Sequence, residues 1–442
     1  LNAWVRIAAD GQVTVAVPRA EMGQGVHTSL AQLVAEELEA DWSRVRAEHP
    51  GPNRAYANTA LLKAVLPLQP DDQGLLARAA RWSMEQAGMM LSLNITGGST
   101  SVRAAWEPMR WAGASARAVL VATAARSWGV KSEECKAEQG RVHHPSSGRS
   151  LGFGELAQQW AAKPLTPPSD LRLKAREQWK VIGTSPKRLD TPAKINGTAA
   201  FGTDLDKAQW PGLQYAALQM CPFLGGRSVK VDDAAAKALR GVRSVHVFAD
   251  WPTPAVAVVA DTTWQALRGA QALKIEWDAG LNTGLSDEQM RQTLSSLLDE
   301  GDRTAFRRTG DAQARLASAQ QTLKAEYEVP PLAHAPMETL NATALFKDGK
   351  LTLWTGTQVP ILARWRASQI ADIDIENVTL HVPFLGGGFG RRLEVDVVEQ
   401  VTHLALKMPG KPVQLLWTRE QDLRHDMVRP PALARLEARL DG

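Results

Sequence analysis

Three glycine-rich segments carry the residue types best suited to chemistry in this sequence, because they can bring backbone amides close to a ligand. Glycine adopts positive φ without steric cost, and a helix that begins beside such a segment favours an anion. Each segment precedes a pattern typical of a helix. If the three converge, they suit one large polar ligand that carries phosphates. Their sequences are Met22-Gly23-Gln24-Gly25, Gly97-Gly98-Ser99-Thr100-Ser101 and Gly386-Gly387-Gly388-Phe389-Gly390.

The spacing of these glycines excludes the two common nucleotide motifs. A Walker A loop ends in Gly-Lys-Ser/Thr, whereas Arg391 and Arg392 follow the last glycine here. A dinucleotide-binding fingerprint needs its third glycine where Arg391 stands. From the residues alone, a packing turn explains residues 386–390 as well as a ligand loop does. A tight turn explains Gly23-Gln24-Gly25 better than a ligand loop does.

Two further polar signals are open when each is taken alone. The hydroxyls of Ser99, Thr100 and Ser101 fit a phosphate or pterin cradle and a helix N-cap with a flexible hinge equally well. Gln358 follows the end of an expected strand, where functional side chains are often presented. By itself, however, that residue is best explained as a solvated glutamine.

The histidines and cysteines do not form a metal site by spacing. None of the nine histidines belongs to an HExxH pattern or lies at metal-ligand spacing from a cysteine. The two cysteines, Cys135 and Cys221, cannot form a zinc ribbon, an iron–sulfur cluster or a disulfide framework. The residues alone therefore indicate a cofactor-binding α/β protein, without a recognisable catalytic acid, base or nucleophile.

The composition and the apolar periodicity indicate a globular protein with several domains. The chain has 442 residues, of which 44% are hydrophobic and 22% charged, and its net charge is +4. No basic run supports binding to nucleic acid, and no apolar run approaches the roughly 18 residues of a transmembrane segment. An α+β, or mixed α/β, fold is predicted. The expected helices cover 29–38, 103–127, 362–371 and 395–406, and the expected strands cover 255–260, 322–329, 350–355 and 378–382.

Several motifs occur in an order that resembles the xanthine dehydrogenase/aldehyde oxidase family of molybdopterin-binding large subunits. Residues 186–197 and 200–204 resemble the entry to that family's a/b hammerhead domain. The position of the Met-Gly-Gln-Gly and Gly-Gly-Ser-Thr-Ser segments ahead of it is similar to the branch that includes the isoquinoline 1-oxidoreductase beta chain. Motifs of the molybdenum-binding part follow in order at residues 333–338, 357–358, 386–392, 416–420 and 429–431.

The resemblance implies four regions along the chain. They are an N-terminal cofactor-loop domain over 1–165, a linker over 166–185 that contains prolines 167 and 168, an a/b hammerhead domain over 186–285, and the start of a molybdenum cofactor-binding domain over 286–442. The last of these is expected to be incomplete at its C-terminal side.

The resemblance also implies a molybdenum–molybdopterin cofactor, in this branch as the cytosine dinucleotide. The pterin holds the metal in this family, so no amino-acid ligand to the metal is expected. The matching residues are Gln358 beside the molybdenum oxo ligand; Gly387, Gly388, Phe389 and Gly390 beside the metal centre; and Gly23, Gln24, Gly25, Ser99, Thr100 and Ser101 along the pterin and its phosphates.

The reaction implied by the resemblance is hydroxylation of an electron-poor carbon in an N-heterocycle or an aldehyde, with oxygen from water. The electrons then leave through 2Fe-2S clusters on a separate small subunit. A chain with two cysteines agrees with clusters that lie on a partner. By family analogy we expect export to the periplasm, and the cytoplasm stays open as an alternative.

The chain departs from the family pattern at the general base, a glutamate in a Gly-x-Gly-Glu motif near the C-terminus. The one copy of that pattern here, Gly152-Phe153-Gly154-Glu155, lies ahead of the hammerhead, and we interpret it as a turn and the start of a helix. Glu338 and Glu394 lie in matched segments but do not occupy the place of the base. We therefore expect this chain to be the N-terminal part of a longer subunit.

Without this base, the 442-residue chain is predicted not to turn over by itself. General base catalysis typically contributes roughly 10²–10⁴-fold to a rate, and the positioned proton acceptor would be absent. The measurement is hydroxylation by the purified chain with molybdenum bound, and measurable turnover would contradict the prediction.

Two other function classes compete with this interpretation. The first is a non-catalytic cofactor-binding or assembly module that keeps the scaffold. The second is a nicotinamide or flavin oxidoreductase that uses residues 386–390. That enzyme needs an acidic residue at a second strand end about 20 residues further on. Residues 406–413 contain lysines and a glycine but no acid, so this alternative ranks lower.

Overall fold

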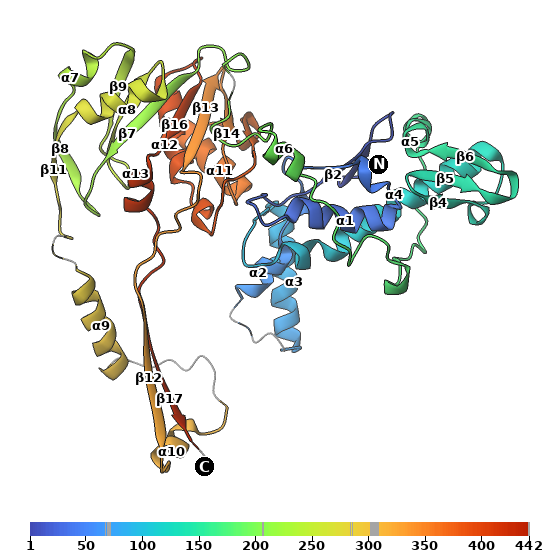
Figure 1. Cartoon of the computed structure of the whole chain (residues 1–442), viewed down its shortest axis with the longest axis horizontal. Helices are drawn as coiled ribbons and strands as arrows, with labels where there is room; N and C mark the ends of the chain where they lie inside the picture. Colours follow the sequence, from blue (N-terminus) through green and yellow to red (C-terminus); the bar gives the residue numbers. More distant parts are fainter. Residues whose placement is uncertain are drawn as a thin grey trace. The chain divides into compact units, whose positions relative to one another are not determined.

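The computed structural model describes residues 1–66, 68, 72–205, 207–282, 284, 286–300 and 309–440. The fold is 38% helical and 22% strand, which confirms the expected mixed α+β class. The chain forms two compact units, each built from two stretches of sequence (Figure 1). The first unit comprises Leu1–Gln214 and Pro336–Leu416, and the second comprises Tyr215–Ala335 and Trp417–Gly442.

The first unit begins with a small sheet packed on two long helices. Strand β1 (Val5–Ile7) pairs antiparallel with β2 (Val13–Ala16), which pairs parallel with β3 (Val45–Glu48). Helices α1 (Val26–Leu38) and α4 (Ser101–Trp128) pack closely. Gly113 of α4 allows this approach, since a Cβ there would lie 2.5 Å from the carbonyl oxygen of Val34. Both expected helices are confirmed, and each begins directly after a glycine-rich segment.

The rest of this front region consists of short elements around α4. They are α2 (Thr59–Ala64), α3 (Leu75–Met90), β4 (Lys136–Glu138), β5 (Arg141–His144), β6 (Arg149–Gly152), α5 (Phe153–Ala162) and α6 (Thr191–Ile195). The Gly-x-Gly-Glu copy is the start of α5, as interpreted from the sequence, and the carboxylate of Glu155 accepts the N–H of Gly152 at 2.9 Å. Its second glycine packs on backbone, since a Cβ at Gly154 would lie 2.3 Å from the carbonyl oxygen of Ala9.

The segment expected to be a linker is bound to α1 by buried carboxylates. One oxygen of Glu36 accepts the N–H groups of Lys180, Val181 and Ile182, at 2.8, 2.7 and 3.1 Å. Its other oxygen pairs with Lys174 Nζ at 2.7 Å, and the side chain of Glu36 is fully buried. The second half of residues 166–185 is therefore part of the packed first unit, although it contains no long helix or strand.

The second stretch of the first unit is a four-strand arrangement covered by two helices. Strand β13 (Asn341–Lys347) lies between β14 (Lys350–Trp354) and β16 (Val413–Leu416), antiparallel to both, and β15 (Val378–His381) pairs parallel with β14. Helices α11 (Pro360–Ala371) and α12 (Asp396–Lys407) bury small and branched apolar residues. The links β14–α11 and β15–α12 carry Gln358 and the third glycine segment, respectively.

The second unit contains the strands expected between the linker and the third region. Strand β10 (Ala255–Ala260) is fully buried and lies between β7 (Gln214–Met220) and β9 (Val242–Phe248), with α8 (Thr263–Ala272) packed on it. The other elements are β8 (Arg227–Asp232), α7 (Ala234–Lys237), β11 (Lys274–Asp278), α9 (Asp287–Glu300), α10 (Ala312–Ala317), α13 (Arg419–Arg424) and the two strands of a ribbon, β12 (Thr322–Val329) and β17 (Ala432–Arg439).

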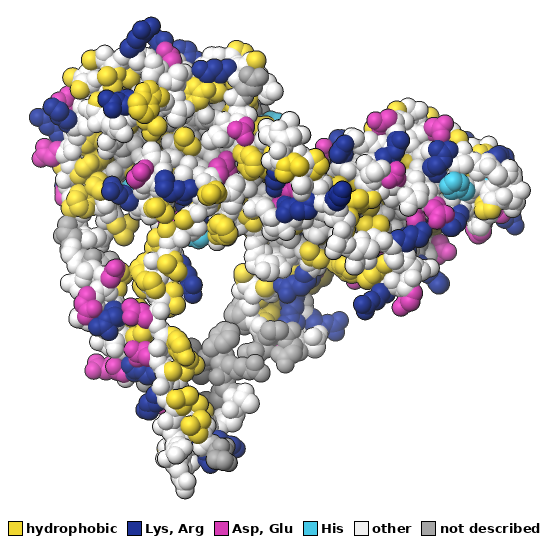
Figure 2. All heavy atoms as spheres, viewed as in Figure 1, with side chains coloured by type: hydrophobic (Ala, Val, Ile, Leu, Met, Phe, Trp, Pro, Cys, Tyr) yellow, Lys and Arg dark blue, Asp and Glu magenta, His cyan; other side chains and the backbone are white. Residues whose placement is uncertain are grey.

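The ribbon of β12 and β17 has one mainly charged face and one apolar face. Residues opposite each other in an antiparallel pair share a face, and alternate residues of a strand do so too. One face is charged and includes the Lys324–Glu437 ion pair at 2.7 Å. The other face carries Leu323, Tyr327 and Leu436, each more than half exposed. Its opposed pairs are Leu323–Ala438, Ala325–Leu436, Tyr327–Ala434 and Val329–Ala432. Hydrophobic side chains line the ribbon in Figure 2.

The attachment of residues 174–182 to α1 predicts a pH-dependent stability. Burial opposes ionisation of Glu36, but hydrogen bonds from Lys174 and from three backbone amides outweigh burial and lower its pKa below the usual 4.5. A carboxyl with a lowered folded-state pKa stabilises the fold above pH 4.5, and this stability is lost as the pH falls through the lower folded value. The Glu36→Gln variant is expected to lose about 3 kcal/mol of unfolding free energy at pH 7.

The measurement is thermal unfolding followed by near-UV circular dichroism at pH 7, 5.5 and 4. The difference between Glu36→Gln and the wild type is expected to shrink at the lowest pH, because the carboxyl of the unfolded wild type then takes up a proton and the native carboxylate contributes less stability. The control is Glu288→Gln, which breaks an exposed pair with Arg291 on α9 and should change little. A pH-independent loss would contradict the assigned role of the charge.

Candidate functional site

The three glycine segments and Gln358 meet at one pocket of the first unit. Its volume is about 340 Å³. The loop before α1, the loop before α4, the β14–α11 link and the β15–α12 link all contribute to it. The lining residues are Met22, Gln24, Thr96, Gly97, Gly98, Ser99, Ser101, Gln358, Phe389, Gly390 and Leu393.

Gln358 is buried in this pocket and is bound to the loop before α4. Its Nε2 donates to the carbonyl oxygen of Thr96 at 2.7 Å, and the N–H of Thr96 donates to the carbonyl oxygen of Gln358 at 2.8 Å. The side chain is 3% exposed, yet its Oε1 has no hydrogen-bond partner among the described residues. A buried acceptor without a donor is costly, so this atom is placed to accept a hydrogen bond from a ligand.

The loop of residues 386–390 lines the pocket with Phe389 and Gly390, and its Gly388 packs closely against Met22 and Gln358. A Cβ at Gly388 would lie 2.4 Å from Met22 Sδ and 2.9 Å from Gln358 Oε1. The loop also needs left-handed backbone at Gly387, Phe389 and Gly390, with φ of 102°, 53° and 107°. For Phe389 this conformation is unusual, and its ring is 73% exposed at the edge of the pocket. The packing role expected from the sequence is thus present, and the ligand-loop interpretation stays a prediction.

A buried ion pair between Arg392 and Glu338 fixes this loop from behind. Arg392 donates to the carbonyl oxygens of Gly387 at 3.0 Å and Gly356 at 3.2 Å, and to the carboxylate of Glu338 at 2.8 Å. The same carboxylate accepts the N–H of Gly386 at 2.9 Å and that of Gly202 at 2.9 Å. Sequence reasoning placed Glu338 in a matched segment but did not assign it this structural role.

The loop before α1 is braced by a residue that sequence reasoning missed. The carboxylate of Glu21 accepts the N–H groups of Gly23, Gly25 and His27, at 2.9, 2.9 and 3.0 Å. The amide of Gln24 also serves the loop, because its Oε1 accepts the N–H of Met22 at 2.6 Å and its Nε2 donates to the carbonyl oxygen of Ala20 at 2.9 Å. An acid two residues before a Gly-x-Gly turn that opens a helix is the signal that could have found Glu21.

The three hydroxyls before α4 have different surroundings. Ser99 and Ser101 line the pocket. Thr100 is 1% exposed, and its hydroxyl donates to the carbonyl oxygen of Gly97 at 2.8 Å and accepts from Asn58 Nδ2 at 2.7 Å. Thr100 therefore holds the loop in shape, and the two serines are the residues with hydroxyls available at the pocket.

Buried basic groups lie beneath the loop before α1. Burial lowers the pKa of Arg19 to about 10, and its Nη1 donates to Asn94 Oδ1 at 2.8 Å. Burial also lowers the pKa of His27, although nearby Glu21 acts in the opposite direction. At neutral pH the Arg19 guanidinium keeps its charge, while the His27 imidazole is held neutral.

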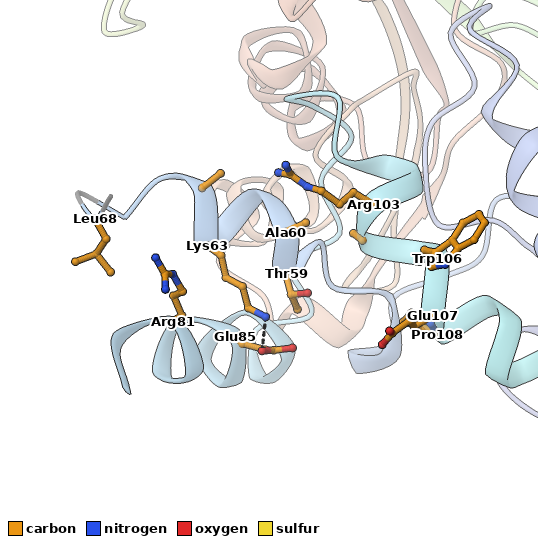
Figure 3. A pocket seen from close by; sticks show the side chains of 12 residues that line it. Thr59, Ala60, Lys63, Leu68, Arg81, Glu85, Arg103, Trp106, Glu107 and Pro108 are labelled. Atoms are coloured by element: carbon orange, nitrogen blue, oxygen red, sulfur yellow. Dashed lines mark ion pairs between the residues drawn. The ribbon is translucent and has the colours of Figure 1, made fainter. Parts of the chain in front are cut away.

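A second pocket of about 690 Å³ lies on the other side of the α4 N-terminus, among α2, α3 and α4. Figure 3 shows Arg103 and Trp106 of α4, with Lys63 of α2 paired to Glu85 of α3 at 2.6 Å. Arg103 lies two residues beyond Ser101, which lines the first pocket. The first residues of α4 therefore line both pockets: Ser101 lines the Gln358 pocket, and Arg103 and Trp106 line the second pocket.

Several other expectations concern what the site lacks or where other motifs lie. In the described ranges, no group of three or more His, Cys, Asp or Glu side chains is placed to hold a metal ion. No helix among the described residues is long and apolar enough to cross a membrane. Glu155 lines a different pocket, together with Asp10 and Arg44, so it is remote from the lining of the Gln358 pocket.

Comparison with known proteins decides the family. One family model described as a molybdopterin cofactor-binding domain matches residues 298–441, and a second with the same description matches residues 1–59. The beta chain of isoquinoline 1-oxidoreductase from Brevundimonas diminuta is 32% identical over 99% of the chain. These matches support the xanthine dehydrogenase family of molybdopterin-binding subunits for this chain.

Two further relatives show the range of the family around this chain. Membrane-bound aldehyde dehydrogenase (pyrroloquinoline-quinone) of Gluconacetobacter polyoxogenes is 32% identical over 99% of the chain, and a subunit of nicotinate dehydrogenase from Pseudomonas putida is 28% identical over 96% of it. The chain spans 56%, 53% and 32% of the lengths of the Brevundimonas, Gluconacetobacter and Pseudomonas proteins. The family resemblance read from the motifs is confirmed.

The Arg392–Glu338 pair predicts a large effect of a conservative change. In Arg392→Lys the charge remains, but one ammonium cannot reach the acceptors on Gly356, Gly387 and Glu338 together. The expected loss is about 3 kcal/mol of unfolding free energy, since a buried carboxylate is left poorly paired.

The loss is measured by denaturant unfolding, with Arg366→Lys as the control. Arg366 donates to Glu399 at 2.6 Å from a half-exposed position, so its lysine variant should stay within about 1 kcal/mol of the wild type. Equal losses in the two variants would show that the contacts of Arg392 with the loop carry no special weight.

Proposed function

We propose that this chain is the cofactor-binding part of a molybdenum hydroxylase that oxidises an aldehyde or an N-heterocycle. The observation that carries the proposal is the pocket in which three separate loops and Gln358 meet, with one buried acceptor left for a ligand. The relatives support the substrate class, because their names refer to isoquinoline, an aldehyde and nicotinate.

The residues present fit a pterin cofactor that brings its own metal. Gly388 leaves space where a Cβ would meet two other segments, and Gln358 Oε1 offers an acceptor at the same place. The proposed contacts of the cofactor are those assigned from the sequence: Gly23, Gln24, Gly25, Ser99, Ser101, Gln358, Gly387, Gly388, Phe389 and Gly390, with Thr100 shaping its loop. A bound molybdopterin supplies two-electron oxidation of a substrate carbon with an oxygen atom from water.

The cytosine dinucleotide form is part of this proposal. It is supported by the second pocket, where Arg103 offers a cation and Trp106 an aromatic ring next to the α4 start, while Lys63 is paired with Glu85. Cations suit phosphates, and an aromatic face suits a stacked base.

Within the site, the chain's own residues bind and orient but do not transfer a proton. No lining residue of the described pocket is an Asp, Glu, His, Lys, Cys or Tyr. Gln358 can accept at Oε1 and keeps one Nε2 hydrogen beyond the one given to Thr96. A general base is thus supplied from outside this pocket, which agrees with the expectation that the chain alone does not turn over.

The electron acceptor in this proposal is a small subunit with 2Fe-2S clusters. Its support is the cysteine count, because two cysteines cannot ligate a cluster of that kind by themselves. The alternative is a non-catalytic cofactor-binding or assembly module. It differs from the enzyme in one observable, turnover by the assembled complex.

Molybdenum and nucleotide analysis of the complex purified from its host tests the proposal. The expected result is about one molybdenum and one cytosine nucleotide per chain, by the family assignment. The Gln358→Leu variant is expected to retain the cofactor and to lose about 10²-fold in turnover, as when one polar partner of a reacting group is removed.

Gln369→Leu, on an exposed face of α11, is the matched control and should turn over normally. A complex without molybdenum, or with a nicotinamide or a flavin in its place, would contradict the proposal. Cofactor without turnover in the wild-type complex would favour the non-catalytic module.

A further inference from the structure

The loop Met22–Gly25 lies between β2 and α1, and its conformation is stabilised by the carboxylate of the preceding residue, Glu21. Its glycines have positive φ, 107° at Gly23 and 81° at Gly25, and a loop of this kind has many other conformations open to it. Helix α1 has no acidic residue in its first turn and no side-chain cap. Glu21, 1% exposed, supplies the missing acceptor and takes three backbone N–H groups of the loop and helix start.

Arg188, far away in the sequence, locks this arrangement. Its Nη1 donates to the carbonyl oxygen of Gly23 at 2.9 Å, and its Nη2 lies 3.3 Å from Glu21 Oε1. The guanidinium is oriented by Asp190, at 2.9 and 2.6 Å, and Asp190 also pairs with Lys194 at 2.6 Å. Arg188, in the segment 186–197 that resembles the hammerhead entry, therefore binds the loop Met22–Gly25 of the pocket.

We call Glu21, Arg188 and Asp190, with their contacts to the loop Met22–Gly25, the clamp. Its charges are stable at neutral pH. Burial disfavours the Asp190 carboxylate, but hydrogen bonds from Arg188 and Lys194 outweigh burial and lower its pKa. The hydrogen bond to Asp190 raises the pKa of Arg188. Both groups of the Arg188–Asp190 pair are therefore charged throughout the neutral range.

The clamp matters to the pocket because a movement of the loop Met22–Gly25 would place Met22 or Gln24 in the pocket. Met22 and Gln24 line the pocket, and Met22 Sδ lies against the backbone at Gly388. A shift of Met22 toward Gln358 would close the space that a ligand needs. A loop already held in its binding shape also spares the ligand the entropy of ordering it.

We propose that Glu21 and Arg188 are positioning residues that hold Met22–Gly25 in the shape required by the ligand, with Glu21 serving as a built-in anion at the N-terminus of α1. Anionic groups of the ligand are thereby directed away from this helix and toward the other loops. The identity of the ligand, but not the clamp, rests on the proposed function.

The first test measures the loop itself in the complex as purified. In Glu21→Gln, an amide nitrogen replaces one carboxylate oxygen and cannot accept an N–H, so at least one of the three donors loses its partner. Hydrogen exchange of the amides of Gly23, Gly25 and His27 is expected to rise about tenfold in this variant and in Arg188→Met. Glu21→Asp, which keeps the charge on a shorter side chain, should give a smaller rise.

The second test measures pterin retained after prolonged dialysis, by fluorescence of its oxidised form. Glu21→Gln and Arg188→Met are each expected to retain about tenfold less than the wild type, and the double variant no less than Glu21→Gln alone, since both residues restrain one loop. Arg243→Met is the matched control, because Arg243 makes an equally short but exposed pair with Asp261 on the other unit.

The outcomes separate the clamp from the proposed function. Unchanged exchange in Glu21→Gln and Arg188→Met, or additive losses of pterin in the double variant, would overturn the clamp. Faster exchange with undiminished pterin would overturn its role in binding. A wild-type complex without pterin would contradict the proposed function, and the exchange rates would then decide the clamp by themselves.

Discussion

The buried ion pair of Arg392 and Glu338 is the interaction on which the site depends. Arg392 is 1% exposed, and a charge so deeply buried is tolerated only when its hydrogen bonds are nearly complete. That requirement forces Gly356, Gly387 and Glu338 into fixed positions around one guanidinium. The hydrogen bonds of the buried Arg392 thus fix the conformation of the glycine loop. They thereby also fix the position of the backbone at Gly388.

The same logic recurs around the pocket, where loops far apart in sequence hold one another. Thr96 and Gln358 exchange hydrogen bonds, and the N–H of Leu385 donates to the carbonyl oxygen of Glu21 at 3.0 Å. The first contact joins the loop before α4 to Gln358, and the second joins the loop before α1 to the loop of residues 386–390, without any ligand. Preorganisation of this kind lets backbone amides and a single glutamine form a specific site without a cluster of charged side chains.

Local patterns were sufficient to predict the elements but not the partners that fix the loops. Local sequence patterns placed α4, β10 and β12 within two residues of their observed ends. A continuous apolar run marked the fully buried β10, whereas an alternation of charged and apolar residues marked β12. The roles of Thr100 and Glu21 could not be read in this way. Thr100 depends on Asn58, which only the folded chain brings near. Glu21 braces N–H groups close to it in sequence, but its contact with Arg188 is likewise formed only by the fold. Gln358, ordinary by its neighbours in sequence, acquires meaning from its burial and its unpartnered oxygen.

The contact of Gly388 with Met22 and Gln358 also limits how this pocket can evolve. Three segments share one point of contact, so a larger residue at any of them must be matched by changes at the others, and single substitutions there are poor starting points for new specificity. Phe389, 73% exposed, and Ser99 lie outside that contact and are free of it. Substitutions at the rim of the pocket are therefore easier to accommodate than substitutions at this contact.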